Sequence, residues 1–199
     1  MDNSTHNSYL VPTTHEVGNA VGMPEAHWFI ARMVRNNTEK KAARLLSKLG
    51  YDNYVATQQQ LREWKNGRRV KTDIVVIPSV VFVHCTEAER RKIVTLPFIS
   101  RFMTDRAAAA PEGMHKPVAT VSDSEMDQLK FMLGVPDARV SFVDHFVKGQ
   151  KVRVVRGPFK NLTGEILNDP NGKTSRLYLN IECLGAAYVE INTLDVKPL

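Results

Sequence analysis

Residues 148–166 read KGQKVRVVRGPFKNLTGEI, and this stretch decides the fold of the carboxyl-terminal part. Val152 and Val154 occupy alternate positions, while Lys151 and Arg153 in between are charged. A period of two indicates a strand with one apolar face. Short strands at this spacing, separated by turn residues, are typical of a small barrel. Further strands are expected over 164–167, 176–183 and 187–191.

The composition indicates a globular protein with an uneven charge. The chain has 199 residues, of which 43% are hydrophobic and 24% charged, which excludes a wholly disordered chain and a collagen-like fibre. Its formal net charge is +6, and residues 26–106 alone carry an excess of nine positive charges. Such a concentration favours a polyanionic partner such as nucleic acid, and a solvated basic surface is the alternative.

Residues 1–25 are polar and contain no Lys or Arg, so we expect a flexible leader rather than a secretion signal. No stretch of the sequence approaches the roughly 18 apolar residues that a membrane-spanning helix needs. Cys85 and Cys183 are too few for a disulfide framework or a four-thiolate zinc site. We therefore expect a cytoplasmic protein that does not enter a membrane.

Residues 26–133 mix strand and helix signals. The apolar run 27–34 is typical of a strand covered on both faces. A tight hairpin is expected at Asn66-Gly67, because both residues tolerate positive φ angles, and a strand is expected just after Pro78. A helix is expected to begin at Asn37 or Thr38 and to end at Gly50, with apolar positions at Ala42, Leu45, Leu46 and Leu49.

Two capping boxes predict further helices, one opening at Thr86 with Glu89 and one at Ser122 with Glu125. Another short strand is expected over 99–103. Gly134 ends the last helix, and we expect 134–146 to be a linker.

The sequence contains no signature of catalysis. It lacks a phosphate-binding Gly-rich loop, a GxSxG elbow and an HExxH motif. His84 and Cys85 are adjacent, but neighbours on a strand point to opposite faces, so Cys85 is expected to be a small core residue. We expect no catalytic residue, no metal site and no cofactor. An enzyme with an unrecognised site is the weakest alternative.

The stretch 148–166 resembles the KOW motif of transcription elongation and ribosomal proteins. Upstream of it, a strand opening with Trp28-Phe29, a basic helix, a basic hairpin and the apolar strand 77–83 follow one another. Phe98 to Phe102 and Pro117 to Ser122 come next. This order is similar to the amino-terminal domain of the NusG and RfaH family. In overall texture the chain looks closest to the UpxY-type antiterminators of Bacteroides capsular polysaccharide operons.

The resemblance covers about 26–133 and 147–199 and implies an α+β sandwich followed by an SH3-like barrel. In the family, the first domain grips the coiled-coil clamp of RNA polymerase through an apolar depression. One departure concerns Pro78-Ser79-Val80, where the family usually has Pro-Gly-Tyr or Pro-Asn-Tyr, so the contacts of that aromatic residue are not carried over. The positions that match the depression are Arg32, Ile77, Pro78, Val80 and Phe82. Core packing is the alternative for Ile77 and Phe82.

The resemblance also implies a nucleic-acid contact on the first helix. Lys40, Arg44 and Lys48 match positions that face the non-template DNA strand of the transcription bubble, and a solvated face is the alternative. The helix after Thr86 carries Arg90, Arg91 and Lys92. It matches the region that reaches toward the other polymerase lobe, so its location is carried over but its contacts are not.

For the barrel, the resemblance implies recruitment of ribosomal protein S10 or the termination factor Rho. The matching positions are Phe159, Cys183 and Leu184. We expect Phe159 to be partly exposed after its Gly-Pro turn and Cys183 to be buried. In RfaH this domain can refold into a helical hairpin, but its β-rich sequence here predicts a barrel.

Together these inferences predict a non-enzymatic elongation factor that binds RNA polymerase and suppresses pausing or termination. The UpxY-like texture implies an operon-specific role. The alternative is a KOW-type RNA-binding or ribosome-associated module without a polymerase role.

Overall fold

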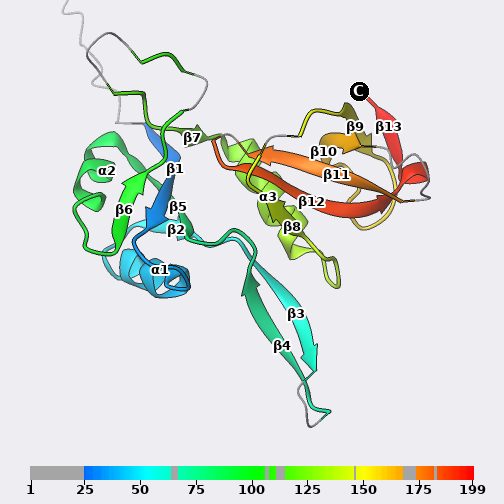
Figure 1. Ribbon diagram of the computed structural model, residues 1–199, viewed down its shortest axis with the longest axis horizontal. Helices are drawn as coiled ribbons and strands as arrows, with labels where there is room; N and C mark the ends of the chain where they lie inside the picture. The colour runs from blue at the N-terminus through cyan, green and yellow to red at the C-terminus, as the bar shows by residue number, and fades with distance from the viewer. Residues whose placement is uncertain are drawn as a thin grey trace, which may run out of the picture.

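The computed structural model describes residues 25–63, 67–105, 108–110, 115–145, 147–167, 174–181 and 183–199 (Figure 1). Almost all of the expected leader lies outside these residues. Within them the chain forms two antiparallel sheets, a two-stranded hairpin and three α-helices. This arrangement confirms the expected α+β class.

A five-stranded antiparallel sheet forms the centre of the amino-terminal domain. Its strands are β1 (Ala26–Met33), β2 (Asp52–Tyr54), β5 (Val80–Thr86), β6 (Ile99–Phe102) and β7 (Thr120–Val121). They run in the order β2-β5-β1-β6, and β7 also pairs with β1. The central β1 is apolar along most of its length because both of its faces are covered.

Three helices cover this sheet. They are α1 (Glu39–Lys48), α2 (Glu87–Ile93) and α3 (Asp123–Gly134). Leu46 of α1 and Ile93 of α2 pack with Phe29 of β1. Leu129 of α3 belongs to a different cluster, with Ile30 of β1. Because Phe29 and Ile30 point to opposite faces of the strand, α1 and α2 cover one face of the sheet and α3 covers the other.

The expected capping boxes are both present. At α2 the Thr86 hydroxyl accepts a hydrogen bond from the Glu89 amide (3.3 Å), and the Glu89 carboxylate accepts one from the Thr86 amide (2.8 Å). Ser122 caps α3 in the same way. Helix α1 ends at Lys48, and Leu49, one of the four apolar positions named for this helix, is 55% exposed. Gly50 follows with φ of +85°, which turns the chain away from the helix.

Strands β3 (Thr57–Glu63) and β4 (Arg69–Val75) form the expected hairpin. They pair with each other, Glu63 opposite Arg69, and the ribbon projects away from the helices (Figure 1). Asn66 of the expected turn lies outside the described residues, and Gly67 has φ of +76°.

A second antiparallel sheet forms the carboxyl-terminal part. Its strands run in the order β13-β9-β10-β11-β12-β8. Val152 and Val154 are buried while Lys151 and Arg153 are exposed, so the expected alternation is confirmed. The sheet is consistent with the expected KOW barrel. Its strands are β8 (Ser141–Val143), β9 (Gln150–Val154), β10 (Thr163–Leu167), β11 (Thr174–Ile181), β12 (Gly185–Asn192) and β13 (Val196–Pro198).

The segment 134–146, expected to be a linker, contributes β8 to this sheet. Phe142 lies opposite Ala187 of β12. Just before β8, the Val140 amide donates a hydrogen bond to the Gln58 side-chain oxygen at the base of the hairpin (3.0 Å). The segment therefore contacts both parts of the molecule.

Helix α3 also joins the two parts. It contacts β1 and β3 of the amino-terminal domain and β11 of the second sheet (Figure 1). The Thr163 hydroxyl donates a hydrogen bond to the Gln128 side-chain oxygen of α3 (2.8 Å). One continuous cluster of buried side chains includes Leu129 of α3 and Leu177 of β11. The two parts thus share a hydrophobic core.

Candidate functional site

The three apolar positions implied to bind polymerase lie inside the domain. Ile77 and Val80 are 1% exposed and Phe82 is not exposed at all. Phe82 lies opposite Ile30 of β1, and its ring centroid is 6.4 Å from that of Tyr54. All three side chains belong to the cluster beneath α3.

Pro78, next to Ile77 in the chain, is exposed, and so are Arg32 and Arg101. Arg32 of β1 lies opposite Val80 on one side and opposite Arg101 of β6 on the other. Two arginines opposite each other on neighbouring antiparallel strands repel, so solvent or a partner must screen them. Arg101 was not predicted from the sequence, and the structure places it opposite Arg32, one of the residues implied to bind polymerase.

Ser79, between Pro78 and Val80, is held in an unusual backbone conformation. Its φ is +62°, in the left-handed region that favours Gly and Asn, the two residues usual in the family at this place. Its amide donates a hydrogen bond to the buried Glu39 carboxylate (2.5 Å), and its hydroxyl donates one to the Asn36 side-chain oxygen. Its carbonyl accepts from the Met33 amide (2.9 Å). This network anchors the turn to the start of α1.

The three cations implied to face DNA all lie exposed on α1. Lys40, Arg44 and Lys48 are four residues apart and so share one side of the helix. The Lys40 ammonium donates a hydrogen bond to the Asp73 backbone carbonyl of β4 (2.7 Å), which ties the helix to the base of the hairpin. Within the described residues, Arg44 and Lys48 form no ion pair. The stripe keeps its positive charge for an external anion.

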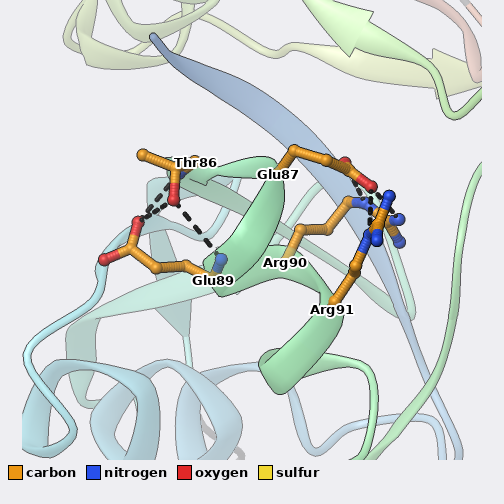
Figure 2. A network of polar contacts seen from close by, with 5 residues as sticks. All are labelled: Thr86, Glu87, Glu89, Arg90 and Arg91. Atoms are coloured by element: carbon orange, nitrogen blue, oxygen red, sulfur yellow. Dashed lines mark hydrogen bonds and ion pairs between the residues drawn. The ribbon is translucent and has the colours of Figure 1, made fainter. Parts of the chain in front are cut away.

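Helix α2 also carries cations, but two of them are paired with a carboxylate of the same helix. Figure 2 shows the guanidinium groups of Arg90 and Arg91 converging on Glu87. Arg90 donates two hydrogen bonds to this carboxylate, at 2.7 and 2.6 Å, and Arg91 donates one at 3.1 Å. The hydrogen bond from Arg90 is the main cause that lowers the pKa of Glu87 to about 2. Two of the three cations on this helix are thus paired within the fold.

Arg90 is also part of the packing. Its side chain is 14% exposed, and its guanidinium carbon lies 5.9 Å from the ring centroid of Phe29 and 5.4 Å from that of Phe102. Contacts at these distances are attractive. Arg90 therefore stabilises the junction of α2 with the sheet, and only Arg91 and Lys92 are well exposed.

In the carboxyl-terminal part, the two predicted partner-binding residues lie in turns between strands and are buried. Phe159 is 5% exposed and Leu184 is 6% exposed. The expectation of a partly exposed Phe159 was wrong, because the turn after Gly157 folds back, with the Asn161 amide donating to the Val154 carbonyl (2.8 Å). Cys183 is buried as expected, and its thiol lies 3.9 Å from a carboxylate oxygen of Asp105. Phe159 also lines a cavity of about 510 Å³ between this turn and the segment before β8.

Two features that bear on chemistry are the Cys85 thiol and the distribution of metal-ligating side chains. Burial is the main cause that raises the pKa of the Cys85 thiol to about 11, so this thiol is not a nucleophile at neutral pH. No group of three His, Cys, Asp or Glu side chains in the described part of the chain is placed to hold a metal ion. Nor does any helix described there have the length and apolarity to cross a membrane.

A family model described as "Transcription termination factor nusG" matches residues 26–130, more than half of the chain. The chain belongs to the NusG family. Members of this family are non-enzymatic transcription factors that bind RNA polymerase. The matched region extends from β1 into α3, so it coincides with the amino-terminal domain described above.

Among solved structures, the chain is similar to NusG of Thermotoga maritima in a structure titled for its domain interaction. The sequence identity is 16% and the TM-score is 0.45, and the likeness covers 88% of this chain and 98% of the other. No curated protein matched the sequence.

Proposed function

We propose that this chain is a transcription elongation factor that binds RNA polymerase through residues 26–133 and suppresses pausing or termination. The observation that carries the proposal is the NusG-family match over 26–130. Such a factor acts by binding one conformation of the polymerase better than another, and needs no catalytic group of its own. It works in the cytoplasm, where bacterial transcription takes place.

The polymerase-binding surface we propose is centred on Arg32, Pro78 and Arg101. These residues are exposed, and the facing arginines are a ready site for acidic groups on a partner. Ile77, Val80 and Phe82 are the apolar floor beneath them. Their close packing supports a surface of fixed shape, which lowers the entropic cost of binding.

The non-template DNA strand is the proposed ligand of the α1 stripe. Its support is the exposure of Lys40, Arg44 and Lys48 and the lack of ion pairs to Arg44 and Lys48 among the residues described. Cations that need no internal partner lose little when they bind phosphate.

Phe159 and Leu184 are proposed to support a site for ribosomal protein S10 or Rho on the second sheet. Because both side chains are buried, they would shape this site more than touch the partner. Because Phe159 lines a cavity, we propose that the partner binds at the side of the sheet where this cavity lies. We further propose that the factor is operon-specific and serves capsular polysaccharide operons, as the UpxY-like texture of the sequence implies.

Affinity purification of the tagged full chain tests the polymerase assignment. The proposal predicts that core RNA polymerase co-purifies with the wild-type chain after nuclease treatment. A double substitution of Arg32→Glu and Arg101→Glu is expected to abolish this, while the control Arg139→Glu with Lys148→Glu leaves it intact. Recovery of ribosomes without polymerase would instead support the alternative of a ribosome-associated module.

A further inference from the structure

Three cations lie together on one face of the second sheet, outside every site assigned above. Lys151 and Arg153 are two residues apart on β9, and Lys197 of β13 lies directly opposite Arg153. All three side chains are exposed, while Val152 between the first two is buried. They therefore point outward on the same face, and we call them the three-cation surface.

No carboxylate in the described part of the chain forms an ion pair with any of the three. On the next strand, β10, Thr163 lies opposite Arg153 and Glu165 lies opposite Lys151. The Glu165 carboxylate accepts a hydrogen bond from the Gly149 amide (2.6 Å). Like charges directly opposite on antiparallel strands destabilise a sheet. The fold thus tolerates a repulsive pair, Arg153 opposite Lys197, without an ion pair to either among the described residues.

Another arginine on the same sheet shows the contrast. Arg176 of β11 lies opposite Glu190 of β12, and its guanidinium carbon is 5.4 Å from the ring centroid of Tyr188. This cation has an aromatic and an acidic neighbour within the fold. Of the three-cation surface, only Lys151 lies opposite a carboxylate, that of Glu165, whereas Arg153 lies opposite Thr163 and Lys197. The charge of Arg153 and Lys197 is therefore available to an external ligand.

We propose that the three-cation surface binds the phosphodiester backbone of a nucleic acid. Lys151 and Arg153 are about 6.6 Å apart along the strand, and the cross-strand pair is closer, at roughly 5 Å between Cβ atoms. Cations at such spacings can contact successive phosphates of one strand. Because β13 is the edge strand, no other strand of the described residues covers Lys197 on that side. The ligand is bound through its charge and not through its sequence.

The three-cation surface lies on strands of the second sheet, whereas the α1 stripe lies on a helix of the amino-terminal domain. The two surfaces are therefore separate. The proposal does not depend on polymerase binding. A chain that fails to bind polymerase can still bind nucleic acid here.

The test uses the full-length chain and fluorescence anisotropy with labelled single-stranded RNA, single-stranded DNA of the same sequence, and duplex DNA. The variant replaces Lys151, Arg153 and Lys197 by Gln. The control variant removes the same charge from exposed positions on other elements, Lys71, Arg139 and Lys160. Affinity is measured against salt concentration, because each phosphate contact contributes about 0.7 to the log–log slope for a single strand.

The proposal predicts that the first variant flattens the slope by up to about two units on the preferred nucleic acid, and the control by less than half as much. The three labelled ligands distinguish RNA from DNA as the source of the phosphates. Equal losses in both variants, or no binding by the wild-type chain, would overturn the proposal. So would tighter binding of poly-glutamate than of any of the three nucleic acids at equal charge, which would indicate an acidic protein as the ligand.

Thermal unfolding provides an independent readout. Removing mutually repelling charges should leave the midpoint of the first variant equal to or above that of the control. A lower midpoint would mean that the fold itself needs these charges, and would contradict the proposal.

Discussion

The two sets of residues implied to bind partners in the amino-terminal domain differ in where the fold places them. Ile77, Val80 and Phe82 are buried in the cluster beneath α3, whereas Lys40, Arg44 and Lys48 are exposed on α1. A resemblance carries over positions but not their exposure, which depends on what packs above each side chain. Substitutions in the first set should therefore act on stability, and substitutions in the second on binding.

The largest expected effect belongs to Phe82. Phe82→Ala removes a fully buried ring and should lower the free energy of unfolding by about 3–5 kcal/mol, because the cavity left behind cannot fully collapse. Urea unfolding followed by circular dichroism measures this. Phe82→Leu is the control, and its free energy of unfolding should fall much less. A loss under about 1 kcal/mol in the Ala variant would mean that the ring is not part of the core.

Substitutions of Ser79 test the strained turn between the exposed Pro78 and the buried Val80. Ser79→Ala keeps a side chain at positive φ and removes the hydrogen bond to Asn36, so we expect a loss of about 1 kcal/mol. Ser79→Gly removes the same hydrogen bond but relieves the backbone, and should be more stable than the Ala variant by about 1 kcal/mol. Equal stabilities of the two variants would contradict the strained conformation.

Glu87 gives a smaller effect that depends on pH. Its pKa in the folded chain is lowered to about 2, below that of the same carboxyl group in the unfolded chain. Its contribution to stability is therefore complete above the unfolded pKa of about 4.3 and is lost as the pH falls toward 2. Glu87→Gln should make the decline of the unfolding midpoint between pH 5 and pH 2 shallower.

Because the Glu87 side chain is 50% exposed, solvent screens the pair and the change should be modest. Glu63→Gln is a matched control, since Glu63 forms its ion pair with Arg69 on the exposed hairpin. A decline that is unchanged by Glu87→Gln would contradict the proposed cause of the pKa shift.

The smallest expected effect on stability belongs to the α1 stripe. Replacing Lys40, Arg44 and Lys48 by Gln should change the free energy of unfolding by less than about 0.5 kcal/mol. It should nevertheless weaken crosslinking to the non-template strand in elongation complexes. Removing Lys71, Arg139 and Lys160 instead is the charge-matched control. Equal crosslinking by both variants would mean that the α1 stripe is a solvated surface that does not contact DNA.

Local signals predicted the elements of the fold well. Thr86 and Ser122 open helices through capping boxes, and the alternation around Val152 gives a strand, because these features depend on neighbours in the sequence. The burial of Phe159 and the strand at Ser141–Val143 were missed. The first depends on how the turn after Gly157 folds back, and the second on pairing with β12, which is distant in sequence. Neither is contained in the local residue pattern.

The candidate site was less predictable for the same reason. Arg32 appeared in the sequence as a charge inside an apolar strand, and only the register of β1 with β6 places Arg101 opposite it. Likewise, the sequence of α2 shows three adjacent cations. Only the packed helix shows that Glu87 and two aromatic rings engage Arg90.

The most direct test of the account is the pause lifetime of purified RNA polymerase, measured at a defined pause site with and without the full-length chain. The account predicts that the wild-type chain shortens the pause and that the variant combining Arg32→Glu with Arg101→Glu, once shown to be folded, does not. The variant combining Arg139→Glu with Lys148→Glu should act like the wild type. Pause lifetimes that are the same with and without the wild-type chain, at concentrations that saturate polymerase, would contradict the account.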